Sequence, residues 1–179
     1  MSSVWQNNKL LRKWEIKHFK ENANGDFNYN LAYPLEDPLV SAISNYINVK
    51  KDYIYVGAGI SQFINAIVGL KNWENVILSD IEFSLYKRTA LLNDKKIIFV
   101  KGIHTEDFIN NLKKVKTSDK DLLCISSPRW FNGELFTKQQ INEILDIYKG
   151  TLIIDEAYID YSDDEKGMID ICLENDRVI

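Results

Sequence analysis

Acidic and aromatic side chains follow an apolar run close to the end of the sequence. Leu152-Ile153-Ile154 is followed directly by Asp155 and Glu156, with Tyr158 two residues further on. A carboxylate at the tip of a buried strand is unfavourable unless it is paired with a cation. A metal ion held as in a Walker B strand needs a GxxxxGK[ST] loop, which this sequence lacks. We therefore expect Asp155 to face an organic cation rather than to act as a structural cap, and Glu156 to be structural.

A glycine-rich turn precedes a helical stripe of apolar residues. The turn reads Gly57-Ala58-Gly59-Ile60-Ser61, and a helix start of this kind presents free N–H groups and a positive dipole end that suit an anion, most often a phosphate. Ser61 can add a hydroxyl group; the alternative is an ordinary turn from strand to helix. A dinucleotide fingerprint needs a third glycine where Gln62 stands. Asp80, at the end of the next strand, keeps a nucleotide or S-adenosylmethionine site open as an interpretation.

Two more strand ends carry aromatic or basic side chains. Phe83 follows one of them, and the loop 126–133 contains Arg129, Trp130 and Phe131. Ligands of open α/β sheets bind at the carboxyl ends of the strands, so these positions are candidate site residues. An aromatic residue at such a place also has the simpler interpretation of a core contact.

Short apolar runs alternate with helical stripes along most of the chain. We expect strands at residues 53–56, 76–78, 97–100, 122–125 and 152–154, with another beginning at 177. The helices expected between them include one over 84–93. Strands that are apolar throughout and alternate with helices indicate a mainly parallel sheet covered on both faces. The sequence thus predicts a three-layer α/β/α fold.

Capping signals place several helix ends. Asp37 is expected to cap a helix with Pro38 at its first position, and Thr105 to cap another. Thr137 and Gln140 have the spacing of a capping box, and Gly150 is expected to end the helix that it opens.

The first part of the chain follows a different pattern. Residues 1–20 are basic and are expected to form an amphipathic helix, and residues 22–32 are expected to be irregular. We therefore divide the sequence into an N-terminal helix and arm at 1–32 and one α/β domain at 33–179.

Composition excludes several classes of protein. The 179 residues are 45% hydrophobic and carry a net charge of −4, which argues against broad binding to nucleic acid. No apolar run reaches the roughly 20 residues of a membrane helix. Cys124 and Cys172 lie in apolar strings and fit a reduced, cytoplasmic protein. With only His18 and His104, a histidine-based metal site is not expected.

The strand-end segments, taken together and in this order, resemble the fold-type I pyridoxal-phosphate enzymes. The resemblance is closest to histidinol-phosphate aminotransferase and threonine-phosphate decarboxylase, and it runs from about Tyr33 to Ile179. The motifs that carry it are Tyr33-Pro34, YIYVGAGISQFINAIV, DIEFSLY, SSPRWFNG and LIIDEAYIDYS. The last of these is the most specific, and the glycine turn alone is weak.

The resemblance implies a role for each of seven residues toward pyridoxal 5'-phosphate. Phe83 would stack on the pyridine ring. Asp155 would pair with the pyridine nitrogen and keep it protonated, which makes the ring an electron sink. The cofactor phosphate would be bound by Gly59, Ile60 and Ser61, the ring hydroxyl by Tyr158, and the phosphate of the neighbouring subunit by Tyr33. The last contact implies a homodimer.

Two departures from the family pattern affect this interpretation. The family asparagine that contacts the ring hydroxyl falls at Trp130, which has one donor and cannot act as an acceptor, so Trp130 is not assigned to the site. The family lysine that binds the cofactor follows the strand expected near Arg177, within a Ser-Lys motif. Lys166 is the one lysine after Asp155, and its context, DDEKGMID, does not match.

Three functional hypotheses follow. In the first, the chain is the N-terminal part, or one half, of a pyridoxal-phosphate-dependent aminotransferase whose substrate is a small molecule, an amino acid or an amino phosphate. A lysine is supplied from outside the segment, and the chain alone is expected to be inactive. In the second, it is a cofactor-binding or assembly module that needs a partner chain. In the third, Gly57, Gly59 and Asp80 bind a nucleotide or S-adenosylmethionine.

Overall fold

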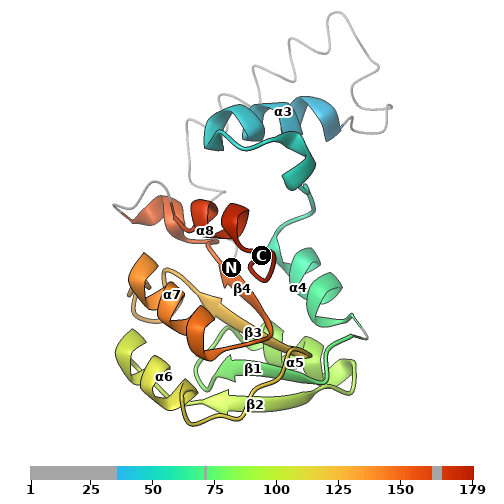
Figure 1. Ribbon diagram of the computed structural model, residues 1–179. Helices are drawn as coiled ribbons and strands as arrows, with labels where there is room; N and C mark the ends of the chain where they lie inside the picture. Colours follow the sequence, from blue (N-terminus) through green and yellow to red (C-terminus); the bar gives the residue numbers. More distant parts are fainter. Residues whose placement is uncertain (1–35, 71, 163–166) are drawn as a thin grey trace, which may run out of the picture. The chain divides into compact units, whose positions relative to one another are not determined.

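The computed structural model describes residues 36–70, 72–162 and 167–179 (Figure 1). They divide into two compact units, one ending at Val56 and one extending from Gly57 to Ile179, and each is described separately. The expected helix at 1–20, the irregular segment 22–32, the boundary after residue 32 and Tyr33 lie outside the described residues.

The first unit contains the helix α3 (Glu36–Ile47) and the short 3-10 helix η2 (Lys51–Tyr53). The cap expected at Asp37 is wrong, because α3 begins one residue earlier. Pro38 is tolerated there, since the N–H groups of the first turn have no partner within the helix. The strand expected at 53–56 is also wrong. Tyr53 and Tyr55 are 70% and 78% exposed, and no strand pairs with this segment among the described residues.

The second unit contains a parallel sheet of four strands. These are β1 (Asn75–Ser79), β2 (Lys96–Val100), β3 (Asp121–Ser126) and β4 (Thr151–Asp155), in the order β2-β1-β3-β4. Each neighbouring pair is parallel, which confirms four predicted strands. Residues 177–179 run beside β4 through a single parallel bridge between Leu152 and Val178, so the further strand expected there is present only as its first pairing.

Helices cover both faces of the sheet (Figure 1). The helices α4 (Ile60–Val68) and α5 (Ser84–Leu92) share a core with Val76 and Leu78 of β1. The helices α6 (Thr105–Leu112), α7 (Lys138–Ile147) and α8 (Ile169–Glu174) pack on the other face against Ile77. Side chains alternate between the two faces of a strand, so the predicted three-layer α/β/α architecture is confirmed.

The helix-capping predictions have mixed outcomes. The capping box is present, with Gln140 N donating to Thr137 Oγ1 over 3.2 Å and Thr137 N donating to Gln140 Oε1 over 2.9 Å. His104, not Thr105, precedes α6 as its N-cap residue; Thr105 is buried and turns its hydroxyl toward Glu134 instead, at 3.1 Å. Helix α7 ends at Ile147, before Gly150, where a Cβ would collide with the Tyr148 ring.

Two classes of feature do not occur in the part of the chain that the structure describes. None of its helices is long and apolar enough to cross a membrane. Its histidine, cysteine and acidic side chains form no group of three that could hold a metal ion.

Candidate functional site

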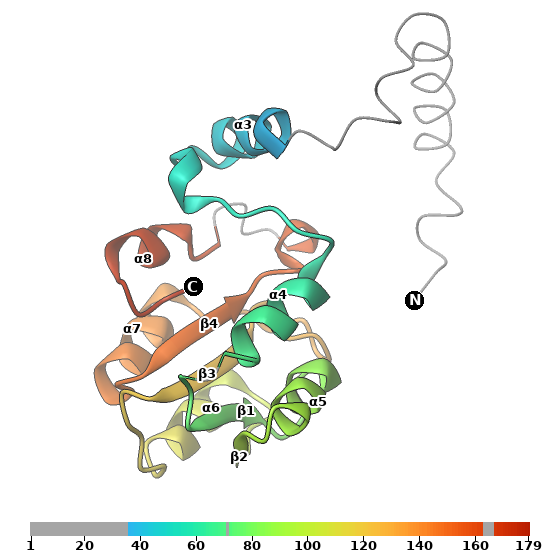
Figure 2. The same cartoon turned by 90° about the vertical axis from the view of Figure 1, so that its right-hand side faces the viewer.

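The carboxyl ends of β1, β3 and β4 meet at one edge of the sheet. Ser126 lies opposite Asp155 in the register of β3 and β4, and Ser127 N donates to Asp155 O over 3.0 Å. The turn that carries Phe83 leaves β1 at this edge. Figure 2 shows β4 running toward the side of the unit on which α4 begins. The parallel sheet therefore gathers strand-end residues from distant parts of the sequence.

Asp155 is a buried carboxylate held in place by two donors. Its side chain is 7% exposed; Oδ2 accepts from the Tyr86 hydroxyl at 2.7 Å and Oδ1 accepts from Ala157 N at 3.0 Å. Among the described residues, no cationic side chain lies within 4 Å of it. A buried carboxylate without a cation is costly, so Asp155 is suited to pair with a positive group on a ligand.

Tyr86 is a site residue that the sequence analysis missed. It lies in the first turn of α5 and is 1% exposed. Burial and the neighbouring Asp155 carboxylate raise the pKa of the Tyr86 hydroxyl well above its usual range. The hydroxyl therefore stays protonated and donates to Asp155. The signal that could have identified it is its place one helical turn after Phe83, directly behind a strand end.

The start of α4 has the geometry of an anion site. Gly59 precedes the helix with φ 77° and ψ 168°, and a Cβ built on it meets nothing within 4 Å. Ala58 N is satisfied by Gln62 Oε1 at 2.6 Å and Gln62 N by Gly59 O at 3.1 Å. The backbone N–H groups of Ile60 and Ser61 are in the first turn, where a helix offers them no acceptor. Both residues are exposed, so these donors are accessible to a ligand.

Helices α4 and α5 run side by side in the same direction. Thr89 Oγ1 donates to Asn65 Oδ1 over 2.7 Å, and four residues later Gly69 faces the side-chain amide of Asn93. In both pairs the residue of α5 follows its partner in α4 by the same number of positions, and the start of α5 follows the start of α4 by that number too. The first turns of the two helices therefore lie level with each other. The glycine turn and Phe83, which is half-buried against the α4–α5 core, therefore lie at the same end of the helix pair.

The loop after β3 is fastened by Arg129, which is 2% exposed. Its guanidinium donates to Ser79 Oγ at 3.0 Å, Gly102 O at 2.9 Å and Ile103 O at 3.1 Å. It also lies 4.8 Å from the centre of the Phe131 ring. Burial lowers the pKa of Arg129, although the acidic groups around it oppose this shift. Arg129 thus joins the loop to the ends of β1 and β2. The Ser127–Pro128 peptide at the start of this loop is cis.

Trp130 spans from this loop to the turn after β1. Its indole N–H donates to Ile81 O over 2.6 Å, and the side chain is 48% exposed. This bond uses the one donor of the indole. Trp130 therefore has no donor left with which to replace the family asparagine.

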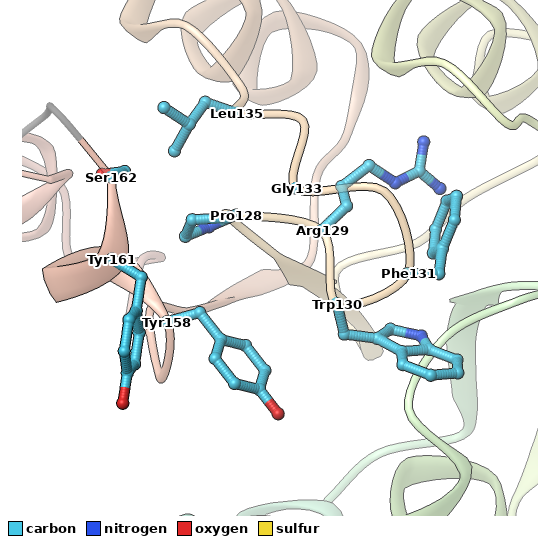
Figure 3. Close-up of a pocket in the computed structure, with 9 residues that line it drawn as sticks. All are labelled: Pro128, Arg129, Trp130, Phe131, Gly133, Leu135, Tyr158, Tyr161 and Ser162. Atoms are coloured by element: carbon cyan, nitrogen blue, oxygen red, sulfur yellow. The ribbon is translucent and has the colours of Figure 1, made fainter.

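A cavity of about 500 Å³ opens between the loop after β3 and the 3-10 helix η3 (Ile159–Tyr161) (Figure 3). Tyr158 lines it and is 51% exposed, with its ring centre 6.4 Å from that of Tyr161. Figure 3 shows the Arg129 guanidinium turned away toward Phe131. Of the predicted cofactor-binding residues that the structure describes, Tyr158 alone lies in the cavity wall, which does not include Gly59, Ile60, Ser61, Phe83 or Asp155.

The parallel sheet, its helices and the strand-end residues define the α/β architecture of a pyridoxal-phosphate transferase large domain. The sequence matches the family model for aminotransferase class I and II over residues 4–178. The chain belongs to this family.

Several known proteins are similar to the chain in sequence or in structure. Histidinol-phosphate aminotransferase from Cytophaga hutchinsonii is 28% identical over 141 residues, which are 76% of this chain and 40% of that protein. The histidinol-phosphate aminotransferase structure from Clostridium acetobutylicum matches with a TM-score of 0.69 and 24% identity, over 90% of this chain and 50% of that one.

Two further solved structures share the fold. L-threonine-O-3-phosphate decarboxylase from Porphyromonas gingivalis matches with a TM-score of 0.72 and 14% identity, over 90% of this chain and 49% of that one. Histidinol-phosphate aminotransferase from Sinorhizobium meliloti, solved with pyridoxal-5'-phosphate, matches with a TM-score of 0.64 and 15% identity, over 76% and 38%. The chain thus spans about 40% of the length of the curated relatives that it matches.

Proposed function

We propose that this chain is the cofactor-holding N-terminal part of a pyridoxal-phosphate-dependent aminotransferase of the histidinol-phosphate type. The observation that carries the proposal is the buried Asp155 carboxylate, held by Tyr86 at a strand end and lacking a cationic partner among the described residues. Membership of the aminotransferase family supports it.

The residues at the strand ends fit pyridoxal 5'-phosphate by their chemistry. The phosphate dianion suits the accessible N–H groups of Ile60 and Ser61 at the start of α4, where the dipole is positive. Gly59 keeps its backbone close to that site without a side chain. The protonated pyridine nitrogen suits Asp155, and the flat ring suits stacking on Phe83.

Each of these residues performs a holding task. When bound, the cofactor supplies an electron sink that stabilises negative charge on the substrate carbon. Asp155 would keep the proton on the ring nitrogen, and Tyr86 fixes the orientation of the Asp155 carboxylate. Phe83 would hold the plane of the ring, and the Tyr158 hydroxyl would donate to the ring hydroxyl. In a homodimer, Tyr33 would bind the phosphate held by the neighbouring subunit.

The remaining machinery is assigned to a further segment or to a complementing chain. The similar proteins are more than twice as long as the matched region, which supports the proposal that the lysine that acts as base and the arginine that binds the substrate carboxylate lie outside it. The substrate proposed for the whole enzyme is a small molecule, either an amino acid or an amino phosphate, and the proposed compartment is the cytoplasm.

Calorimetric titration of the chain with pyridoxal 5'-phosphate tests the proposal. The wild type should bind, and Asp155→Asn should weaken binding by about 100-fold because it removes a charge from a buried ion pair. Asp121→Asn is the matched control, since Asp121 is buried at the opposite end of β3. No binding by the wild type, or equal affinities for wild type and Asp155→Asn, would contradict the proposal. Tight nucleotide binding without a response to pyridoxal phosphate would favour a nucleotide site at Gly57, Gly59 and Asp80.

A second candidate function is a cofactor-binding or assembly module without transaminase activity. The observation that favours it is the indole N–H of Trp130, which is already bonded to Ile81 O. Trp130→Asn separates the candidates. If the site is that of an active aminotransferase, the asparagine should leave cofactor binding within about twofold, because the proposed contact of Tyr158 would hold the ring hydroxyl without it. An increase in cofactor affinity of about tenfold would indicate that the native site lacks the contact that the family asparagine makes, which favours the second candidate.

A further inference from the structure

Glu82 is a partly buried carboxylate of the DIEFSLY segment, and neither the sequence analysis nor the proposed cofactor contacts give it a role. It lies in the turn between β1 and α5, which is closed by a hydrogen bond from Glu82 N to Ser79 O. Its Oε1 accepts from Phe83 N at 2.9 Å and from Ser126 Oγ at 2.8 Å. Oε2 is 3.4 Å from Ser126 N. One carboxylate therefore joins the start of α5 to the end of β3.

This bridge ends beside the proposed cofactor contacts. Ser126 is the register partner of Asp155, and Phe83 is the residue proposed to stack on the cofactor ring. Phe83 is only half-buried, so core packing by itself does not fix its ring. The charged group that acts on Glu82 is Arg129, but the guanidinium of Arg129 donates its hydrogen bonds to Ser79, Gly102 and Ile103. The hydrogen bonds of Glu82 therefore hold the turn, not an ion pair.

We infer that Glu82 is a positioning residue that fixes Phe83 against the cofactor ring by fastening the β1–α5 turn to the end of β3. The inference rests on the proposed function. The carboxylate is suited to this task because a single oxygen accepts from both elements. Its amide counterpart retains that oxygen, so the positioning does not require a negative charge. Burial raises the pKa of Glu82, which agrees with a group that acts through hydrogen bonds.

Three variants separate positioning from a structural role. Glu82→Ala removes all three hydrogen bonds and should weaken binding of pyridoxal 5'-phosphate by about tenfold. Glu82→Gln keeps the shared acceptor and loses only the long bond from Ser126 N to Oε2, so it should restore affinity to within about twofold of wild type. Thr137→Ala removes a helix cap on the other face of the sheet and is expected to lower stability without changing affinity. The readouts are the dissociation constant by calorimetry and the unfolding midpoint of the free chain.

A double-mutant cycle with Phe83→Ala tests whether Glu82 acts through Phe83. If it does, adding Glu82→Ala to Phe83→Ala should weaken binding by no more than about twofold further. If Glu82→Ala does not fold, Ser126→Ala removes the other end of the bridge and should weaken binding by about threefold, again without further effect when Phe83 is already alanine.

The outcomes distinguish this inference from the proposed function. The positioning role would be overturned if the fold-changes in dissociation constant of Glu82→Ala and Phe83→Ala multiply in the double variant. It would also be overturned if Glu82→Ala and Glu82→Gln lose the same affinity. In either case, binding by the wild type would still uphold the cofactor site. No binding by the wild type would overturn both. The positioning role is supported if Glu82→Ala weakens binding, Glu82→Gln restores it, and the double variant binds no more weakly than Phe83→Ala alone.

Discussion

The Tyr86 hydroxyl donates a hydrogen bond of 2.7 Å to Asp155 Oδ2, joining the first turn of α5 to the end of β4. Both side chains are buried, and 69 positions of sequence separate them. The bond fixes the direction of the carboxylate that is proposed to meet the cofactor. It also gives a buried charge one of the partners that it needs for a stable fold.

Tyr86→Phe is expected to destabilise the chain. The substitution keeps the ring and leaves Asp155 Oδ2 without its donor, so the free energy of unfolding should fall by about 2 kcal/mol. Urea unfolding followed by circular dichroism measures the loss. Tyr46→Phe is the control, because Tyr46 is 82% exposed. A loss in Tyr86→Phe no larger than in the control would show that the hydrogen bond does not matter for stability.

Gly59→Ala is expected to damage both the fold and the proposed phosphate site. The φ of 77° and ψ of 168° lie in a region almost restricted to glycine, so the strain should lower the unfolding free energy by about 1–3 kcal/mol. Gly133→Ala is the matched comparison, with φ 74° and equally open space for a Cβ. Titration with inorganic phosphate and with pyridoxal 5'-phosphate should show weaker binding for Gly59→Ala than for Gly133→Ala. The reverse order would argue against a phosphate site at α4.

Most of the sheet could be predicted because its strands are short, continuous apolar runs. The run at Val76-Ile77-Leu78 has the same signature as the buried strand that it forms. Tyr53 to Val56 has a similar composition and is no strand, because pairing requires a partner that local sequence does not reveal. Thr105 illustrates the same limit at a helix start, since its hydroxyl turns to Glu134, a residue distant in sequence.

Arg129→Met is expected to be strongly destabilising. It removes the donors to Ser79 Oγ, Gly102 O and Ile103 O from a buried position, and the loss should be about 3 kcal/mol. Arg129→Lys should recover only part of it, because an ammonium group lacks the fork of donors. Urea unfolding compares the variants. A loss below about 1 kcal/mol for Arg129→Met would indicate that the loop does not depend on this residue.

Stability should depend on pH through Glu82. Burial raises its pKa above the ordinary 4.5, against the opposing hydrogen bonds from Phe83 and Ser126. The folded state therefore binds the proton more tightly than the unfolded state does. Its contribution to stability is fully present below pH 4.5 and is lost as the pH rises through the raised pKa of the folded state.

The matched variant for this effect is Glu82→Gln, which cannot titrate. The difference in unfolding free energy, wild type minus Glu82→Gln, should become less favourable to the wild type as the pH rises above 4.5. Urea unfolding at several pH values measures it. A difference that does not change, or that favours the wild type increasingly as the pH rises, would show that Glu82 does not have a raised pKa.

Some residues of the candidate site could be predicted from the sequence and others could not, as for the elements of the fold. Asp155 and the turn at Gly59 could be predicted because each follows or precedes a recognisable element and has a residue type with defined chemistry. The roles of Tyr86, Glu82 and Arg129 could not, although Arg129 is among the strand-end candidates of the sequence analysis. Each acts through partners on other strands or loops, and in the sequence they resemble ordinary polar residues of a helix or a turn.

The most direct test of the central claim is the ¹⁵N chemical shift of pyridoxal 5'-phosphate labelled at the pyridine nitrogen and bound to the chain. If Asp155 pairs with the ring, the shift should be that of a protonated pyridinium in the wild type and should move toward the neutral form in Asp155→Asn. Tyr86→Phe should retain the protonated shift, since the carboxylate remains. A neutral ring in the wild type, or a protonated ring in both wild type and Asp155→Asn, would contradict the assignment of Asp155.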